Sequence, residues 1–573
     1  MRSTLKISVG QYSDKGRKPA NQDFHGILVP DEPLLSLKGI AIVLCEGISS
    51  SNVSHIASST AVKSFLTDYY ATSQSWSVKI SACRVLEATN SWLHSATRNG
   101  HARYDPDKGY VCTLSAMVIK STTAHLFHIG DSRIFRVVGT TLEQLTDDHR
   151  VAVSAEHSYL GRALGVNSHI EIDYQSLRID RGDIFVLATD GVWEFASRRF
   201  MSECIAGHRD DLDLAARLIA DEAMRAGSAD NLTIQIIRID DVPSGQAGEI
   251  FGQTIDLPPA PLLEPRTVFD GYRIVRELHA SARSHLYLAV DVESATQVAI
   301  KIPSVELRGD AAHLKRLMME EWVASRIASP HVLRPGSAVR KRTHLYVVTE
   351  FIDGQTLSQW MIDNPNPDLE TVRGIVEQIA KGLRAFHRMD MVHQDLRPAN
   401  IMIDKSGTVK IIDFGATRIA GVAESAPEAR QAEILGTLQY TAPEYFLGED
   451  GTSRSDIFSL GVIAYQMLTG QLPFGAEIAT AKARVQLGKL AYRSARALNP
   501  TVPGWVDGAL KRATQPDARK RYEDLSEFVF DLRHPNAKFL TTPHTPLIAR
   551  HPLLFWQLLT ALLACVIVAL LAR

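Results

Sequence analysis

The 573-residue chain has few cysteines, and its charge is close to balanced. No two of its cysteines have the C-x-x-C spacing of a zinc knuckle, and the five stand far apart, at Cys45, Cys83, Cys112, Cys204 and Cys565. We therefore expect reduced thiols rather than a disulfide framework or a zinc site. The 62 basic and 64 acidic residues exclude a protein that binds nucleic acid through its overall charge. The N-terminus also lacks the continuous apolar core of a secretory signal.

The length is too great for one ordinary hydrophobic core and predicts two or three folded domains. Two proline-rich stretches without helical or strand periodicity read as extended spacers between them. These spacers divide the chain into five parts: a first domain over residues 1–241, a linker over 242–268, a second domain over 269–534, a linker over 535–552, and a terminal segment over 553–572.

The terminal segment, from Leu553 to Ala572, contains no charged residue. About 20 residues at a rise of 1.5 Å give roughly 30 Å, which is the hydrocarbon thickness of a bilayer. A buried core helix or an amphipathic packing helix are the alternatives, but apolar residues cover every face of this segment. We expect a single-pass, tail-anchored membrane protein with the remainder of the chain on the cytoplasmic side, because only Arg573 follows the segment and no signal sequence precedes it.

The first domain alternates short apolar runs with helical periodicity, which favours an α+β or layered fold. The runs predict strands at 39–44, 114–119, 125–129, 184–188 and 232–237, and the periodicity predicts a helix across 211–226. The second domain begins with strand-like runs at 272–278, 286–290 and 297–302 and becomes mainly helical after Leu369. A small β lobe followed by a larger helical lobe is expected there.

Five acidic residues of the first domain stand beside apolar runs or glycines: Asp23, Glu46, Asp131, Asp190 and Asp230. Any one of them alone is typical of a solvated turn. Together they predict a site for hard divalent cations, which prefer carboxylate oxygens and can share a water molecule for phosphoryl hydrolysis.

The order of the motifs NQD, CEG, GDSR, LTDDH, ATDG and SADNLT resembles that of the PPM (type 2C) metal-dependent protein phosphatases. The resemblance covers about residues 5–240 and implies a β-sandwich flanked by helices, with manganese or magnesium at one end. It implies that Asp23, Glu46, Asp190 and Asp230 bind a metal pair, that Gly47 offers its carbonyl, and that Asp131 serves a third ion. Arg17 is implied as a phosphate contact.

One departure concerns Glu46, because the resemblance implies an aspartate at this position. Ser49 and Ser50 also replace the expected glycines. A carboxylate remains but is one methylene longer. The sequence therefore leaves open an active phosphatase or a degenerate regulatory domain.

The second domain carries four motifs in order: VAIK ending at Lys301, HQDLRPAN over 393–400, DFG over 413–415 and APE over 442–444. Each motif alone is a common strand or turn. Together they resemble the eukaryotic-type protein kinases, which implies a bilobal fold that uses ATP and magnesium. The expected fold class is therefore a multidomain α+β protein: a PPM-type β-sandwich, a bilobal kinase fold and one C-terminal transmembrane helix.

The kinase resemblance also implies residue roles. Lys301 holds the α- and β-phosphates and is oriented by Glu320, with Glu321 as the alternative partner. Asp395 accepts the substrate hydroxyl proton. Asn400 and Asp413 coordinate magnesium. Further roles are implied for Arg397 in catalysis, Ser281 and Ser284 beside the phosphates, Glu350 as first hinge residue, Thr349 as gatekeeper, Thr441 in Ser/Thr specificity, and Glu444, Asp456 and Arg521 in the helical lobe.

Three departures bear on kinase activity. The segment 279–284, which corresponds to the Gly-rich phosphate loop, contains no glycine, and side chains there hinder close backbone approach to phosphate. Gln394 replaces the arginine that usually binds a phosphate on the activation segment, so we expect a kinase independent of phosphorylation there. Arg397 replaces a lysine and keeps the charge as a planar fork. An active Ser/Thr kinase and a pseudokinase both remain open.

The sequence thus predicts a membrane-tethered bifunctional enzyme that phosphorylates and dephosphorylates protein Ser/Thr side chains. Ser425, Thr437 and Thr441 are candidate autophosphorylation sites that the phosphatase could reset. The alternatives are a signalling scaffold with one or two inactive domains, and a kinase whose phosphatase domain only senses or inhibits. No nucleic-acid partner is expected, and the sequence does not indicate the substrate or the oligomeric state.

Overall fold

The computed structural model describes residues 4–152, 158–243, 257–336, 342–424, 439–475, 490–540 and 552–571. These residues form two compact units. The first contains the described residues up to Asp353 together with 382–395 and 411–424, and the second contains 354–381, 396–410 and the described residues from 439 onward. The domain boundaries expected from the sequence stay predictions.

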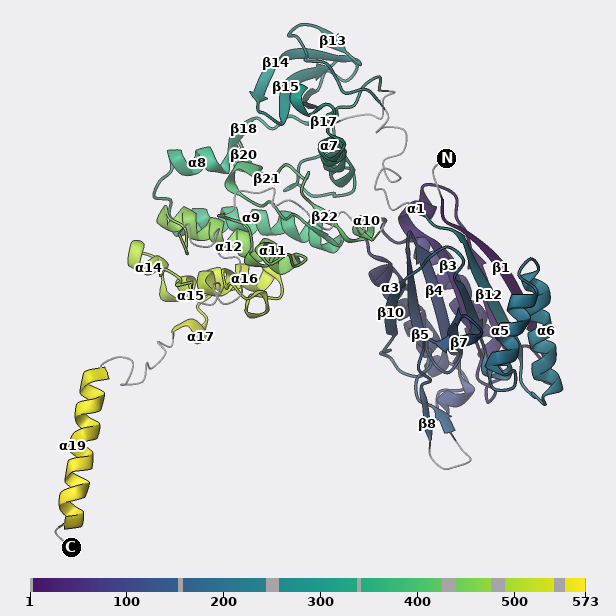
Figure 1. Ribbon diagram of the computed structural model, residues 1–573. Coiled ribbons are helices and arrows are strands. Elements are labelled where there is room, and N and C mark those ends of the chain that lie inside the picture. The colour runs from purple at the N-terminus through teal and green to yellow at the C-terminus, as the bar shows by residue number, and fades with distance from the viewer. Residues whose placement is uncertain are drawn as a thin grey trace. The chain divides into compact units, whose positions relative to one another are not determined.

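The N-terminal part of the first unit is a sandwich of two five-stranded antiparallel sheets (Figure 1). One sheet has the order β1 (Lys6–Asp14), β12 (Leu232–Asp241), β11 (Ile184–Ala188), β6 (Arg133–Val138), β7 (Thr141–Gln144). The other has the order β10 (Asp173–Arg178), β5 (Thr123–Ile129), β4 (Leu114–Lys120), β3 (Ile40–Cys45), β2 (Phe24–Leu28). All five strands predicted for this domain are present.

Apolar side chains of both sheets fill the space between them. Ile42 and Met117 from one sheet and Phe185 and Ile237 from the other belong to this core. Every residue of β3 and β4 is buried, because helices cover the outer face of their sheet as well. A strand buried on both faces has no need of polar residues, which explains the continuous apolar runs in the sequence.

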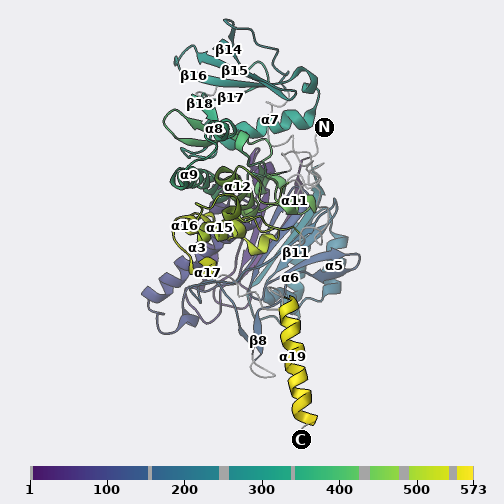
Figure 2. The ribbon, with the colours of Figure 1, turned by 90° about the vertical axis from the view of Figure 1, so that its left-hand side faces the viewer.

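Two helices cover the outer face of each sheet. α2 (Ser54–Ala71) and α3 (Val78–Asn99) pack on the sheet that contains β3, and α5 (Arg198–Gly207) and α6 (Leu212–Arg225) pack on the other. Figure 1 shows α3 on one side of the sandwich and α5 and α6 on the other, and Figure 2 shows the molecule turned by 90°. The predicted sandwich flanked by helices is confirmed, as is the helix expected across 211–226. The short helices α1 (Leu34–Lys38) and α4 (Asp190–Trp193) complete this region.

The first unit also contains a smaller lobe built on a third five-stranded antiparallel sheet. Its strands follow the chain order: β13 (Val268–Phe269), β14 (Tyr272–Ala280), β15 (Ser284–Asp291), β16 (Gln297–Pro303) and β17 (Val347–Glu350). The helix α7 (Ala311–Ala324) packs against β16 and β17. The three strands predicted for this lobe are confirmed.

Three short elements of the first unit lie close to the predicted kinase motifs. β19 (Met391–Val392) pairs with β22 (Arg418–Ile419), which continues into α10 (Ala420–Ala423). Phe414 is buried, and its ring lies 5.3 Å from the ring of Phe386 and 6.2 Å from that of His393. Packing of the Phe414 ring therefore fixes the residue that follows Asp413.

The second unit is mainly helical, as expected after Leu369. Its main helices are α8 (Leu357–Asp363), the N-terminal part of α9 (Leu369–Arg388), α12 (Ser453–Thr469), α15 (Gly504–Ala513) and α16 (Leu525–Arg533). Arg521 donates to both carboxylate oxygens of Glu444, at 2.8 and 2.7 Å, and its side chain is fully buried. Both residues, for which the sequence implied roles in the helical lobe, therefore pair with each other.

The C-terminal segment forms α19 (Pro552–Leu571). Across the ranges that the structure describes, none of the helices combines the length and the hydropathy that a bilayer crossing requires. The expected transmembrane helix is therefore not confirmed. The segment predicted to span the bilayer ends at Ala572, which lies outside the described residues.

The described cysteines agree with the expectation of reduced thiols. Cys45, Cys83, Cys112 and Cys204 are all free. The side chain of Cys565 lies outside the described part of the structure.

Candidate functional site

The acidic residues singled out in the first domain stand at the ends of sandwich strands. Glu46 directly follows β3, and Asp23 directly precedes β2, whose first residue Phe24 pairs with Cys45. Asp190 directly follows Thr189 at the end of β11, and Asp230 precedes β12. Strand pairing therefore explains why residues more than 200 positions apart in the sequence meet at one edge.

Burial raises the pKa of two members of this group, Asp23 and Glu46. Thr233 Oγ1 donates to Asp23 Oδ2 at 2.7 Å, while the buried Asp23 Oδ1 has no hydrogen-bond partner. Burial, together with the charges of Asp230 and Asp190, raises the pKa of Asp23 to about 7. Burial and the same kind of repulsion raise the pKa of Glu46 well above its ordinary value. Among the residues that the structure describes, neither carboxylate forms an ion pair.

Arg150 holds two other members of the group. Its Nε donates to Asp131 Oδ2 at 2.8 Å, and its Nη2 donates to Asp190 Oδ2 at 2.9 Å. A third contact, 2.6 Å long, joins Nη1 to Glu194 Oε1. Asp190 Oδ1 is nevertheless buried without a partner. The guanidinium thus neutralises one side of the carboxylate group.

Lys18 takes a corresponding place at Asp230, with which its ammonium group forms an ion pair. Asn231 stabilises the loop that carries Lys18, since its side-chain amide donates to the carbonyls of Lys15 and Ala20 at 2.9 and 3.0 Å. Arg17, the predicted phosphate contact, instead approaches Met224 O at 3.5 Å. Sequence reasoning identified neither Lys18 nor Arg150, although each stands beside one of the motifs.

Gly47 occupies a position that accepts no side chain. A Cβ atom there would lie 2.8 Å from Ser54 Oγ and 2.9 Å from Gln22 O. Its N–H donates to Gln22 O at 3.1 Å, which ties the residue after Glu46 to the residue before Asp23. The glycine therefore allows the two carboxylate-bearing loops to meet.

Among the residues that the structure describes, no group of three or more His, Cys, Asp or Glu side chains is arranged so that it could hold a metal ion. Arg150 forms ion pairs with Asp131 and Asp190, and Lys18 forms one with Asp230. The expectation that Asp23, Glu46, Asp190 and Asp230 bind a metal pair, with Asp131 at a third ion, stays a prediction.

The chemistry of the residues present nevertheless fits divalent cations. Two buried carboxylate oxygens, one on Asp23 and one on Asp190, accept no hydrogen bond. Burying an ionised carboxylate without a partner is costly, and hard cations of the magnesium and manganese type prefer such oxygens. The unpartnered oxygens of Asp23 and Asp190 lie among carboxylates whose negative charges raise one another's pKa. This arrangement is consistent with a site for cations.

In the smaller lobe, Lys301 on β16 lies between two acidic side chains. Its Nζ donates to Glu320 Oε1 on α7 at 2.5 Å and lies 3.8 Å from Asp413 Oδ1. The positive charge of Lys301 holds the pKa of Asp413 below its ordinary value, which keeps this carboxylate ionised at neutral pH. The structure thus brings together three of the predicted site residues.

Glu320 rather than Glu321 is the partner of Lys301. The next residue, Glu321, instead accepts a 2.7 Å hydrogen bond from Arg342 Nη1. Successive residues of a helix point in different directions, so only one of the two glutamates can face β16. Asp413 itself has a φ of 64°, in the left-handed region that is unusual for a residue other than glycine.

The segment without glycines forms a tight turn between β14 and β15. Ser281 Oγ accepts hydrogen bonds from Arg283 N at 3.3 Å and from Ser284 N at 3.1 Å, and donates to Ser284 O. The turn is also attached to the end of β16, because Ser304 Oγ donates to Ala282 O at 2.8 Å. The hydroxyl of Ser281, predicted to contact ATP, is thus engaged within the turn.

The remaining predicted kinase residues belong to both units. Glu350 ends β17 and accepts a 2.9 Å hydrogen bond from Arg334 N, and Asp395 follows β19 in the first unit. Arg397 and Asn400 belong to the second unit, where Asn400 ends the short helix η5 (Pro398–Asn400) and is buried. Thr441 is buried in the same unit. Ser425 and Thr437 lie outside the described residues.

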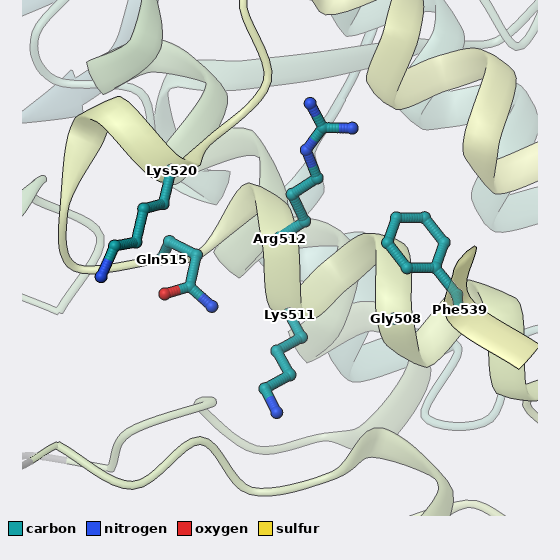
Figure 3. A pocket seen from close by; sticks show the side chains of 6 residues that line it. All are labelled: Gly508, Lys511, Arg512, Gln515, Lys520 and Phe539. Atoms are coloured by element: carbon teal, nitrogen blue, oxygen red, sulfur yellow. The ribbon is translucent and has the colours of Figure 1, made fainter. Parts of the chain in front are cut away.

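A separate cavity of about 350 Å³ lies in the second unit. Figure 3 shows the ring of Phe539 beside Gly508, with basic side chains around it. Its lining consists of Gly508, Lys511, Arg512, Gln515, Lys520 and Phe539. A Cβ at Gly508 would lie 2.5 Å from Phe539 Cβ, so the glycine permits this packing. None of the predicted site residues lines the cavity.

Replacing Arg150 with methionine tests whether its guanidinium competes with cations for Asp131 and Asp190. We expect Arg150→Met to lower the melting temperature without added metal and to give a larger thermal shift with manganese than the wild type, because the freed carboxylates gain a new partner. Thermal shift measured over a manganese titration checks this. Arg199→Met, which removes an exposed arginine paired with Glu203, is the control. An unchanged manganese shift would contradict the expectation.

Comparison with known proteins matches these two regions separately. Residues 272–532 match the protein kinase domain family, and residues 12–225 match the protein phosphatase 2C family. The serine/threonine-protein kinase PrkC of Bacillus subtilis is 31% identical over 262 residues, which cover 46% of this chain and 40% of PrkC. The serine/threonine-protein kinase PknA of Corynebacterium glutamicum is 31% identical over 261 residues, which cover 45% of this chain and 54% of PknA.

Two solved structures resemble parts of this chain with low TM-scores. The kinase domain of Mycobacterium tuberculosis PknI is 25% identical, with a TM-score of 0.37, and the match covers 47% of this chain and 98% of that chain. The serine/threonine phosphatase of S. agalactiae is 21% identical, with a TM-score of 0.35, and the match covers 41% of this chain and 100% of that chain. The matched part of this chain spans about half or less of the length of the two curated relatives. The chain therefore contains a protein phosphatase 2C domain followed by a Ser/Thr protein kinase domain.

Proposed function

We propose that this protein is a bifunctional enzyme that phosphorylates protein Ser/Thr side chains with ATP and hydrolyses phosphoserine or phosphothreonine. The observation that carries the kinase part is the contact of Lys301 with both Glu320 and Asp413. The carboxylate group at one edge of the sandwich supports the phosphatase part.

In the proposed kinase reaction, each residue has a distinct task. Lys301, oriented by Glu320, would bind the α- and β-phosphates of ATP. Asp395 would accept the proton of the substrate hydroxyl and orient that hydroxyl toward the γ-phosphate, and Arg397 would stabilise the negative charge nearby. Asn400 and Asp413 would hold magnesium, which when bound neutralises charge on the phosphates.

In the proposed phosphatase reaction, the sandwich residues supply the negative charge that would hold the cations. Asp23, Glu46, Asp190 and Asp230, with the Gly47 carbonyl, would hold manganese or magnesium, and Asp131 would serve a third ion. When bound, such ions lower the pKa of a coordinated water and polarise the phosphoryl group. The additional methylene of Glu46 is compatible with this role because its carboxylate lies close enough to Asp190 and Asp23 to be repelled by both.

A signalling scaffold is the second candidate function, and two observations favour it. Arg150 and Lys18 already neutralise part of the carboxylate group, and the Ser281 turn replaces a flexible Gly-rich loop. A scaffold with two inactive domains binds neither nucleotide nor manganese, so thermal shift with each ligand separates the two functions, provided that turnover is also measured.

The presence of both activities in one chain implies a reversible switch on shared protein substrates. A covalent linker raises the effective concentration of each domain near a target that the other domain has bound. We further propose that α19 attaches the chain to a membrane, with both catalytic domains on the cytoplasmic side. The support is the uncharged sequence from Leu553 to Ala572 and the helical conformation of Pro552–Leu571.

Substituting Lys301 or Asp413 tests the kinase activity. In the full-length protein, Lys301→Met and Asp413→Ala should each lower phosphate transfer from ATP to a generic Ser/Thr substrate by roughly 10² or more, because each removes a charge that faces the phosphates. Lys381→Met, which removes an exposed lysine from α9, should leave the rate unchanged. Equal, background-level transfer by the wild type and Asp413→Ala would reject the kinase assignment.

A parallel experiment tests the phosphatase activity. Manganese-dependent hydrolysis of a phosphothreonine peptide by the full-length protein should fall roughly 10²-fold in Asp190→Ala and in Asp230→Ala, because both changes remove carboxylates that would hold the cations. Asp180→Ala removes an exposed aspartate and serves as the matched control. Hydrolysis that survives both site substitutions would show that the activity arises elsewhere.

Cell fractionation tests the membrane attachment. The full-length protein should sediment with membranes and resist extraction by alkaline carbonate, because an apolar helix partitions into the bilayer. A variant that ends after Leu540 should remain in the supernatant. Recovery of the full-length protein in the carbonate-soluble fraction would reject the anchor, whichever catalytic activities are found.

A further inference from the structure

The first unit joins the phosphatase sandwich to a short kinase segment, residues 420–424. This segment contains α10 and ends at Glu424, directly before the undescribed residues 425–438. The sandwich contacts it through Lys120, at the end of β4, and through the loop between α2 and α3, residues 72–77, while α10 also lies against α1 (Figure 1). These contacts lie outside both candidate catalytic sites.

Lys38, a buried lysine at the end of α1, gives the 72–77 loop its shape. Its ammonium group donates to Thr72 Oγ1 at 2.7 Å, Ser73 O at 2.6 Å and Ser81 Oγ at 3.0 Å. These bonds leave the carbonyls of Gln74, Ser75 and Trp76 free to face Gly421. Because Lys38 uses all three of its donors, the loop conformation is set within the sandwich itself.

Gly421 fits against this loop closely. Its N–H donates to Ser75 O at 2.9 Å. A Cβ atom at this position would lie 2.6 Å from Trp76 O, 2.8 Å from Gln74 O and 3.0 Å from Ser75 O. Only glycine allows the α10 backbone to approach three carbonyl oxygens at this distance, so the interface selects this residue.

Glu424 supplies the charge of the interface. Its two carboxylate oxygens accept hydrogen bonds from Val78 N at 3.2 and 3.0 Å, at the N-terminus of α3, where the helix dipole favours an anion. Its Oε2 also lies 3.2 Å from Lys120 Nζ. Lys120 is completely buried and donates in addition to Gly421 O. An ammonium group in that position needs an opposite charge, and Glu424 is the anion that the structure places beside it.

The kinase side of this interface continues into the candidate active site. Asp390, whose Oδ2 accepts from Ser77 N at 3.1 Å, precedes β19, and β19 pairs with the strand β22 that leads into α10. Eight residues before Gly421 stands Asp413, whose carboxylate faces Lys301. In the docked arrangement the contact of Lys301 with Glu320 is also formed. The structure therefore combines the contact of residues 420–424 with the sandwich and the contacts of Lys301 with Glu320 and Asp413.

We propose that Lys120 and Glu424 are positioning residues for the kinase, through which the phosphatase domain holds the segment after Asp413 in its productive conformation. In a typical kinase, an arginine binds a phosphate on the activation segment and so holds that segment in place. Gln394 replaces this arginine here, and the ionic contact between Lys120 and Glu424 would hold the segment instead. The inference rests on the proposed kinase activity. It adds that the phosphatase domain activates the kinase by contact, independently of phosphate hydrolysis.

Kinetics of the full-length protein test this inference. Lys120→Met, Glu424→Gln and Gly421→Ala should each lower kcat/KM for a protein substrate about tenfold, with the KM for ATP and the manganese-dependent phosphatase rate within about twofold of the wild type. Lys120→Met/Glu424→Gln should be no worse than either single change, because both remove one contact. Lys63→Met, on the exposed face of α2, and Gly374→Ala, where a Cβ meets no neighbour, are the matched controls.

Hydrogen–deuterium exchange provides a readout that does not need activity. Peptides covering 418–424 should exchange faster in the three variants than in the wild type, because the N–H of Gly421 loses its acceptor. Slower turnover together with faster exchange supports the inference. Faster exchange with unchanged or increased kinase activity would overturn the inference. Unchanged exchange in the variants would also overturn it. A wild type without kinase activity but with slow exchange at 418–424 would instead reject the proposed function and leave the docking contact established.

Discussion

Burying an ionised side chain costs several kcal/mol unless an opposite charge or a set of hydrogen bonds meets it, and each important region of this protein depends on that constraint. Lys301 meets Glu320 and Asp413 in the kinase lobe. Arg521 meets Glu444 in the helical unit. In each case the partners come from different elements, so neutralising the charge also fixes how those elements pack.

The carboxylate group of the phosphatase domain is the place where this constraint is only partly satisfied. Arg150 and Lys18 neutralise some of the negative charge, but Asp23 Oδ1 and Asp190 Oδ1 are buried without partners. The buried side chains of Lys301 and Arg521, by contrast, each meet an opposite charge within the fold. This incomplete match at one edge of the sandwich is consistent with the proposed cation site, in which Glu46 would also take part.

Much of this architecture could be predicted from local sequence patterns. Continuous apolar runs predicted β3, β4 and β11 because strands covered on both faces contain few polar residues. The resemblance to protein kinases implied the correct ion pair, Lys301 with Glu320. By contrast, Lys120 and Glu424 are 304 positions apart, and nothing in the neighbourhood of either residue indicates the other. Arg150 escaped notice for a similar reason, since its partner Asp190 lies 40 positions away.

The antiparallel register of β3 and β4 separates the two charged regions of the sandwich. Ile40 pairs with Ile119, whereas Glu46 follows Cys45 at the other end of β3, so Lys120 and Glu46 stand at opposite ends of the sheet. Six residues of strand separate them by about 20 Å. The contact between Lys120 and Glu424 is therefore remote from the carboxylate group, so one side of the sandwich can bind a neighbouring segment while the opposite edge keeps its own arrangement of charges.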